Sequence, residues 1–340
     1  MCKDAFLMLR HLSTGGSHRT LKEALQLRSN KSSPVMRSIL SIIVACACLL
    51  QASALLFPRT NVILTNDDGW AEKNIRAFNS DLIAAGYNVL LVGPAENESG
   101  TGSKEATPTV LNITCEFDTC PIGSSPEGFN SSNVRLNYVN SFPVTTIKFG
   151  LQKLAPRFFG RKPDIVVSGF NVGANLGPTT QISGTVGAAT EAAKEGVPAI
   201  AFSGTTGTQI SFTATTPSPN YPAVYAALST TVTNALTRTA KPFLPPNVYL
   251  NVNFAAVTAS NCTSPEDFRF VFTRIENATA QTPPDFRTCG SNRLPTETEV
   301  VRSGGCFTSI SVGSAFTKND TNAVDQAFVH AKISHLLSCF

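Results

Sequence analysis

The run Asn61-Val62-Ile63-Leu64-Thr65-Asn66-Asp67-Asp68-Gly69 joins a short apolar segment to a polar cluster. Its first half is aliphatic and β-branched, the pattern of a strand buried in a parallel sheet. Its second half places two adjacent carboxylates at the end of that strand, where they repel each other unless a cation lies between them. Because ligands of open α/β sheets bind at strand carboxyl ends, the run predicts a metal site. A solvated Asn-Asp-Asp-Gly turn is the alternative interpretation.

The segments that follow alternate between helix and strand patterns. Residues 72–85 predict a helix closed by Gly86, and residues 88–92 predict a second strand, which together form a right-handed parallel crossover unit. Further strands are expected at 163–169, 198–203, 247–252, 268–273 and 307–312, and further helices at 143–154, 183–195, 221–237 and 322–337. The pattern predicts an α/β fold with a Rossmann-like, doubly wound and mostly parallel sheet, elaborated in its carboxyl-terminal half.

The composition is that of a globular protein, since 42% of the 340 residues are hydrophobic and 15% are charged. The formal charge of +4 comes from residues 1–54, which hold seven Lys or Arg and two acidic residues. The remainder carries 20 basic and 21 acidic residues, a net charge of −1. Overall charge therefore gives no indication of a nucleic-acid groove.

An apolar run at residues 39–56 follows Arg37 and contains Ala52-Ser53-Ala54 near its end. This pattern predicts a secretory signal peptide cleaved after Ala54, and hence a secreted protein without a stable membrane partner. Either translation starts at Met36 or the gene model is extended before it. The run is nearly long enough to cross a bilayer, so an uncleaved signal anchor is the alternative. We expect an N-terminal extension with a signal over 1–54 and one domain over 55–340.

Cysteines and glycosylation motifs agree with secretion. Six cysteines follow the signal, and an even number in a secreted chain predicts disulfide bonds. Cys115 and Cys120 are close enough to pair locally, while the other four allow three pairings. Zinc is the alternative, but no Cys-x-x-Cys pair or histidine cluster supports it. Asn-x-Ser/Thr motifs, which predict a glycoprotein, begin at Asn112, Asn130, Asn261, Asn277 and Asn319.

Polar clusters follow three of the predicted strands, at residues 66–69, 97–100 and 168–171. A parallel sheet brings such strand ends together, and their oxygen atoms suit a hard cation such as Mg²⁺ or Mn²⁺. The helix starting near Ser183-Gly184-Thr185 offers free backbone N–H groups that can hold a phosphate. Together these features predict metal-assisted hydrolysis of phosphate esters, with the metal activating water.

The same motifs, in order and spacing, resemble the SurE-type phosphatase/nucleotidases over roughly residues 61–204. The motifs are Asn66-Asp67-Asp68-Gly69, Gly93-Pro94 through Ser99-Gly100, Ser168-Gly169-Phe170-Asn171 and Ser183-Gly184-Thr185-Val186. The resemblance implies a divalent-metal phosphomonoesterase acting on nucleoside monophosphates or similar esters. For a secreted eukaryotic member it implies an acid phosphatase or 5′(3′)-nucleotidase.

The resemblance also implies roles for particular residues. The metal ligands would be Asp67, Asp68, Ser99 and Asn171, with Asp67 and Asp68 as the catalytic residues and Asp67 as a proton acceptor. Contacts to the substrate phosphate would come from Asn66, Ser183, Gly184 and Thr185. The family further implies a homodimer or homotetramer. This sequence departs from the family pattern at Ala71-Glu72-Lys73, where bacterial members usually have Ala-Pro-Gly, and at Ala95 and Ile182. These departures bear on substrate choice more than on metal binding.

Two other functions remain open: an exopolyphosphatase on the same scaffold, and a catalytically inactive secreted binding module. The sequence contains no Gly-x-Ser-x-Gly elbow, Walker loop or His-Glu-x-x-His motif, which weighs against serine hydrolases, NTPases and zinc proteases. His330 and His335 are expected to be surface or packing residues. Asn97 also begins a glycosylation motif, but a glycan beside Ser99 would crowd the site, so Asn97 is predicted to be unmodified.

Overall fold

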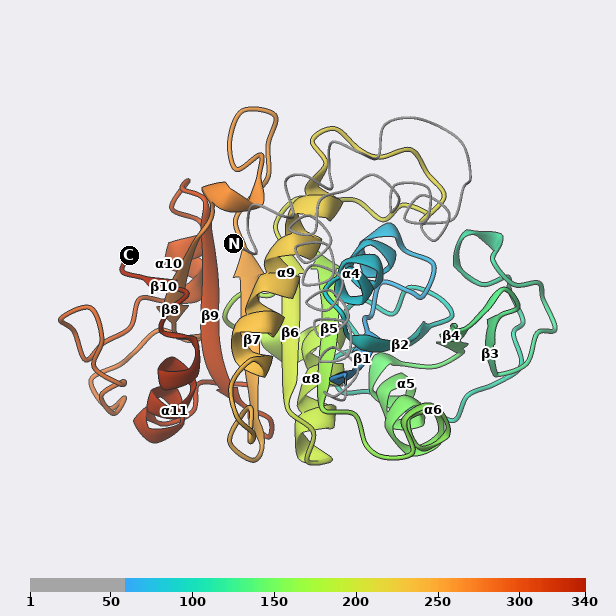
Figure 1. Cartoon of the computed structure of the whole chain (residues 1–340), viewed down its shortest axis with the longest axis horizontal. Helices are drawn as coiled ribbons and strands as arrows, with labels where there is room; N and C mark the ends of the chain where they lie inside the picture. Colours follow the sequence, from blue (N-terminus) through green and yellow to red (C-terminus); the bar gives the residue numbers. More distant parts are fainter. Residues whose placement is uncertain (1–58) are drawn as a thin grey trace, which may run out of the picture. The chain divides into compact units, whose positions relative to one another are not determined.

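Ten strands form one central sheet in the part of the chain that the computed structural model describes, residues 59–340 (Figure 1). The predicted N-terminal extension and signal, residues 1–54, lie outside the described residues. Within residues 59–340 we find no helix with the length and apolar character needed to cross a bilayer.

The sheet is mostly parallel. Its strands are β1 (Asn61–Thr65), β2 (Asn88–Pro94), β3 (Glu127–Asn130), β4 (Asn133–Val139), β5 (Ile165–Val172), β6 (Ala199–Gly204), β7 (Val248–Phe254), β8 (Arg269–Thr273), β9 (Phe307–Ser314) and β10 (Leu337–Ser338). Their order in the sheet is β10-β8-β9-β7-β6-β5-β1-β2-β4-β3, and Figure 1 shows them in this order from left to right. Only the β7/β9 and β3/β4 pairs are antiparallel in this sheet. The predicted fold class is confirmed.

Helices cover both faces of the sheet (Figure 1). They are α4 (Lys73–Ala84), α5 (Pro143–Phe149), α6 (Ala155–Phe159), α7 (Thr179–Ile182), α8 (Gly184–Lys194), α9 (Tyr221–Thr237), α10 (Glu297–Val301) and α11 (Ala323–Ile333). Side chains of α4, α9 and α11 enter one hydrophobic core, in which Phe78 and Tyr225 are fully buried. Side chains of α5 and α8 enter a second core on the opposite face, which includes Ile63 and Ala189.

Strand β5 is longer than the sequence predicts. The predicted strand ends at Gly169, whereas β5 runs to Val172 through a change of register between Ser168 and Asn171. Gly169 makes this possible, because its φ is +118° and a Cβ there would lie 2.3 Å from the carbonyl oxygen of Phe202. Asn171 therefore lies on a strand instead of a loop.

Three helix predictions also need correction. The final helix ends at Ile333 instead of Leu337, because Leu337–Ser338 pair with β8 as β10. The helix expected at 143–154 continues through a π-helical turn, Gly150–Leu154, into α6. The sequence prediction missed α10, which starts with a capping box between Thr296 and Glu299.

Disulfide bonds account for all six cysteines in the described residues. The expected local bond Cys115–Cys120 is present, and the other two are Cys262–Cys306 and Cys289–Cys339. This pairing leaves no thiolate of residues 59–340 for zinc.

A buried ion cluster ties β8 to the loops of the carboxyl-terminal half. Arg274 is 4% exposed, and its guanidinium donates to the Asp285 carboxylate at 2.8 Å and to Asp320 at 3.2 Å. Arg293 contacts the same Asp285 at 3.1 Å, but its side chain is 37% exposed.

Arg274→Ala is therefore expected to lower the free energy of unfolding by about 3–5 kcal/mol, because it leaves buried carboxylates without their cation. Arg293→Ala is expected to cost about 1 kcal/mol or less, since water reaches that pair. Urea denaturation measures both values. Equal losses from the two variants would contradict the assignment of Arg274 as the cation that this cluster depends on.

Candidate active site

The three polar clusters meet at one edge of the sheet. Strand β1 lies between β2 and β5 and is parallel to both, so the carboxyl ends of all three point the same way. Residues 66–69 follow β1, residues 97–100 follow β2, and residues 168–171 form the end of β5. The backbone N–H of Glu98 donates to the carbonyl oxygen of Asp67 at 2.7 Å, which holds the β2 loop against the β1 turn.

Asp67 lies at the N-terminus of α8. The Thr185 hydroxyl donates to its carboxylate, and the backbone N–H groups of Thr185 and Gly184 also face it. A Cβ on Gly184 would lie 2.8 Å from the Cβ of Asp67, so only glycine allows the helix to approach this closely. Burial raises the pKa of Asp67 above its usual value, although these hydrogen bonds act in the opposite direction.

Asp68 is held by two donors from other elements. The backbone N–H of Val172 donates to its Oδ2 at 2.9 Å, and the Gln209 amide donates to its Oδ1 at 2.7 Å. The side chain is fully buried. Burial, and then the charges of Asp67 and Glu72, raise the pKa of Asp68 well above its usual value.

Two further carboxylates lie close to this pair. Burial raises the pKa of both Glu72 and Glu116 to about 8, and the nearby charge of Asp68 adds to the shift of Glu116. One oxygen of each carboxylate is buried without a hydrogen-bond partner among residues 59–340. Within those residues, neither these two groups nor Asp67 and Asp68 form an ion pair with a Lys, Arg or His. The site therefore brings four carboxyl groups together without a Lys, Arg or His of the described chain to stabilise their ionised forms.

The oxygen atoms around the aspartate pair fit a hard cation. The Asn171 amide donates its N–H groups to the carbonyl oxygens of Val172 and Gly173, so its Oδ1 stays buried without a donor in the described chain. Ser99 lies exposed in the β2 loop. Carboxylate, amide and hydroxyl oxygens are what Mg²⁺ and Mn²⁺ bind. Residues 59–340 contain no cluster of three or more His, Cys, Asp or Glu arranged for a metal, so such an ion would depend on the Ser and Asn oxygens as well.

The residues predicted to contact phosphate lie beside this pair, and several of them already make structural bonds. Asn66 is 1% exposed, and its amide donates to the carbonyl oxygen of Gly69 at 2.8 Å, which closes the turn. The Ser183 hydroxyl caps α8 by accepting from the Val186 N–H at 3.1 Å. Ser183, Gly184 and Thr185 thus form a helix N-terminus directed at Asp67, an arrangement that binds anions.

Sequence reasoning missed Gln209. It lies in the Ser/Thr-rich segment after β6, between the predicted strand at 198–203 and the predicted helix at 221–237, where the sequence predicts no helix or strand. The rule that strand carboxyl ends line the site would have drawn attention to it, because β6 pairs with β5 in parallel.

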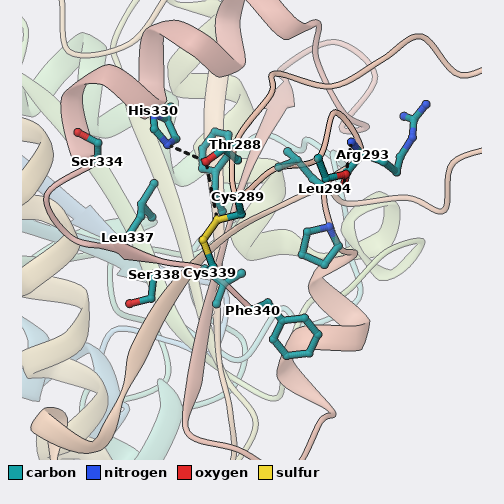
Figure 2. Close-up of a pocket in the computed structure, with 14 residues that line it drawn as sticks. Thr288, Cys289, Arg293, Leu294, His330, Ser334, Leu337, Ser338, Cys339 and Phe340 are labelled. Atoms are coloured by element: carbon teal, nitrogen blue, oxygen red, sulfur yellow. Dashed lines mark hydrogen bonds between the residues drawn. A yellow bond between two sulfur atoms is a disulfide. The ribbon is translucent and has the colours of Figure 1, made fainter.

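A cavity of about 440 Å³ lies elsewhere, beside β8 and β10 (Figure 2). It is lined by the Cys289–Cys339 disulfide, His330 and Phe340, and by none of the predicted site residues. His330 packs against Phe272 and Phe286, with ring centroids 5.5 and 4.9 Å apart, and its Nε2 contacts the Thr288 hydroxyl. The expectation that His330 is a packing residue agrees with these contacts.

Comparisons with known proteins give the family. A family model described as Survival protein SurE matches residues 62–282. The chain belongs to the SurE family. It is 34% identical over 287 residues to an acid phosphatase of Yarrowia lipolytica, which covers 75% of this chain and 79% of that protein.

Bacterial SurE proteins match a shorter stretch. Identity to the 5′-nucleotidase SurE of Desulfovibrio desulfuricans is 39% over 145 residues, which is 42% of this chain and 49% of that protein. The chain thus spans about half the length of that relative. The crystal structure of the SurE protein from Aquifex aeolicus superposes with a TM-score of 0.53 and 22% identity, covering 80% of this chain and 98% of that chain. This likeness confirms the SurE fold.

A buried glutamate supports the loop that leads from β5 to α7. Glu297 is fully buried, and its carboxylate accepts from the Gly177 N–H at 2.8 Å, the Asn251 amide at 3.0 Å and the Ser311 hydroxyl at 2.9 Å. Burial raises the pKa of Glu297 from 4.5 to about 8.

This shift predicts a pH dependence of stability. Between pH 4.5 and 8 the folded chain holds a proton on Glu297 that the unfolded chain has lost, so its contribution is fully present below 4.5 and is lost as the pH rises through 8. In the wild type, this proton makes the free energy of unfolding fall by up to about 1.4 kcal/mol for each pH unit in that range. Glu297→Gln has no such proton to lose, so it should remove this part of the slope. Glu299→Gln on the same helix is the control, since hydrogen bonds from Thr296 lower the pKa of Glu299 and keep its titration below this pH range. Urea denaturation from pH 5 to 8 measures the slopes, and an unchanged slope in Glu297→Gln would refute the prediction.

Proposed function

We propose that the chain is a hydrolase of phosphate monoesters that depends on Mg²⁺ or Mn²⁺, an acid phosphatase or nucleoside-monophosphate 5′(3′)-nucleotidase. The observation that supports this best is the buried pair Asp67 and Asp68, which has no cationic partner in the described chain and of which Asp67 faces the N-terminus of α8. The relatives named acid phosphatase and 5′-nucleotidase support the reaction class. The alternative, an exopolyphosphatase on the same scaffold, is tested with a panel that contains both polyphosphate and nucleoside monophosphates.

The divalent cation would be held by Asp67, Asp68, Ser99 and Asn171. When bound, it would neutralise charge on the phosphoryl group and activate water for attack. The orphaned Oδ1 of Asn171 and the unbalanced carboxylates support this assignment.

The chain's own residues would perform the other tasks. The N-terminus of α8, with Ser183, Gly184 and Thr185, would bind phosphoryl oxygens through backbone N–H groups and hydroxyls. Thr185 already orients the Asp67 carboxylate, which would accept a proton from the attacking water. Burial of these groups excludes bulk water and strengthens each electrostatic contact.

We further propose that the protein is a secreted, glycosylated homodimer or homotetramer. Three disulfides in the described residues support an oxidising compartment. Four of the five predicted glycosylation sites are exposed, and Asn130 is half-buried. Oligomer formation is supported by the family resemblance alone.

Asp67→Asn tests the role of the carboxylate pair in catalysis. It is expected to lower phosphate release from p-nitrophenyl phosphate and nucleoside monophosphates by at least about 100-fold, because it removes a metal ligand and proton acceptor. A chelator should abolish wild-type activity, and added Mg²⁺ or Mn²⁺ should restore it. Asp81→Asn, on α4 and away from the site, is the control and should keep wild-type rates. Activity that survives both the chelator and Asp67→Asn would refute the metal-dependent mechanism, and inactivity of the wild type would favour the binding module.

Gly184→Ala tests the close approach of α8 to Asp67. Gly184→Ala places a methyl group 2.8 Å from the Cβ of Asp67 and 2.9 Å from the Cγ of Pro143, so Asp67 or the helix must move. Activity is expected to fall about 10- to 100-fold through misplacement of the carboxylate. Thermal unfolding distinguishes this loss from unfolding of the domain. A fully active, folded Gly184→Ala variant would show that the close contact is not needed.

A further inference from the structure

The loop of residues 205–219 follows β6 and lies beside the candidate site. Its first part is fixed to the sheet, because the Thr205 N–H donates to the Phe254 carbonyl oxygen at 3.1 Å and the Thr206 hydroxyl donates to that of Val257 at 3.0 Å. Gln209 is half-buried within this loop, and its Nε2 reaches Asp68 Oδ1 at 2.7 Å. A residue outside the family motifs thus contacts one of the two central carboxylates.

The middle of the loop is bonded to the first turn of α4. The Lys73 N–H donates to the carbonyl oxygen of Ile210 at 2.9 Å, and the Phe212 N–H donates to that of Ala71 at 3.0 Å. The Lys73 ammonium donates to the carbonyl oxygen of Ala214, and the Arg76 guanidinium lies 4.5 Å from the centre of the Phe212 ring. These bonds fix the loop on both sides of Gln209.

The contacts between the start of α4 and the loop bear on one departure of the sequence from the family pattern. In the segment Ala71-Glu72-Lys73, the Glu72 carboxylate caps α4 by accepting from the Asn74 N–H, and Lys73 contributes both its N–H and its ammonium to the loop. A proline at the position of Glu72 would have no carboxylate for the cap, and a glycine in place of Lys73 would have no ammonium. The Lys73 ammonium is therefore the part of this segment that helps to hold the loop in place, while Glu72 caps α4.

We propose that Gln209 is a positioning residue for the cation site: its amide fixes the orientation of the Asp68 carboxylate, with Val172 N–H holding the other oxygen. Each Asp68 oxygen then accepts one bond from the chain and keeps a lone pair for a cation. Hydrogen-bond partners of metal ligands change metal affinity by roughly 10–100-fold when they are removed. This inference rests on the proposed metal-dependent function.

The test is Mn²⁺ binding to the full chain by isothermal titration calorimetry, without substrate. Gln209→Ala and Gln209→Asn, whose amide is one methylene shorter, are both expected to weaken Mn²⁺ binding at least about 10-fold. The matched control is Gln152→Ala, because the Gln152 amide also donates to a carboxylate, that of Glu195 at 2.8 Å, on an exposed surface. Thermal unfolding of the metal-free variants should match the wild type. With saturating Mn²⁺, kcat for p-nitrophenyl phosphate should fall while KM stays unchanged.

The outcomes separate the two proposals. Wild-type Mn²⁺ affinity in both Gln209 variants would overturn the positioning role alone. A wild-type chain that binds no Mn²⁺ would overturn the metal-dependent function and the positioning role together. Weaker binding in the Gln209 variants, with Gln152→Ala unchanged, supports the role of Gln209 even if p-nitrophenyl phosphate proves to be a poor substrate.

Discussion

Two adjacent carboxylates buried at the end of a hydrophobic strand repel each other, and the surrounding structure has to balance that repulsion. Asp67 and Asp68 are 2% and 0% exposed, and the carboxyl groups of Glu72 and Glu116 lie close by. No ion pair within residues 59–340 offsets this charge. Hydrogen-bond donors and a bound cation are the available means of keeping such groups ionised in a protein interior.

The donors come from elements far apart in the sequence. The N-terminus of α8 donates hydrogen bonds to Asp67, while β5 and the 205–219 loop donate to Asp68. Because β5 and β1 are neighbours in the sheet, the backbone of Val172 reaches Asp68 without any special side chain. The parallel sheet thus brings the hydrogen-bond donors of the carboxylate pair together at one edge. This sheet is the scaffold of the SurE family, to which the chain belongs.

The carboxyl-terminal half stabilises the site from a distance. Glu297, at the start of α10, receives a hydrogen bond from Gly177 in the loop that leads to α7, and Asn251 joins it from β7. The Arg274 cluster and two long-range disulfides hold the outer strands and loops together. The bond from Gly177 to Glu297 restricts the backbone between Asn171 at the end of β5 and Ser183 at the start of α8.

Local sequence patterns determined much of the fold and much of the candidate site. Apolar periodicity and glycine stops predicted the central strands and helices, and the motifs ending in Asp67-Asp68, Ser99 and Asn171 predicted a shared sheet edge, because strand direction alone brings such ends together. The tertiary structure decided what depends on distant contacts. β5 continues through Gly169 because Phe202 lies against it, and Leu337–Ser338 form a strand because β8 pairs with them. Gln209 contacts Asp68 because α4 holds the loop of Gln209 in place. The two residues lie 141 positions apart, so no local pattern encodes their contact.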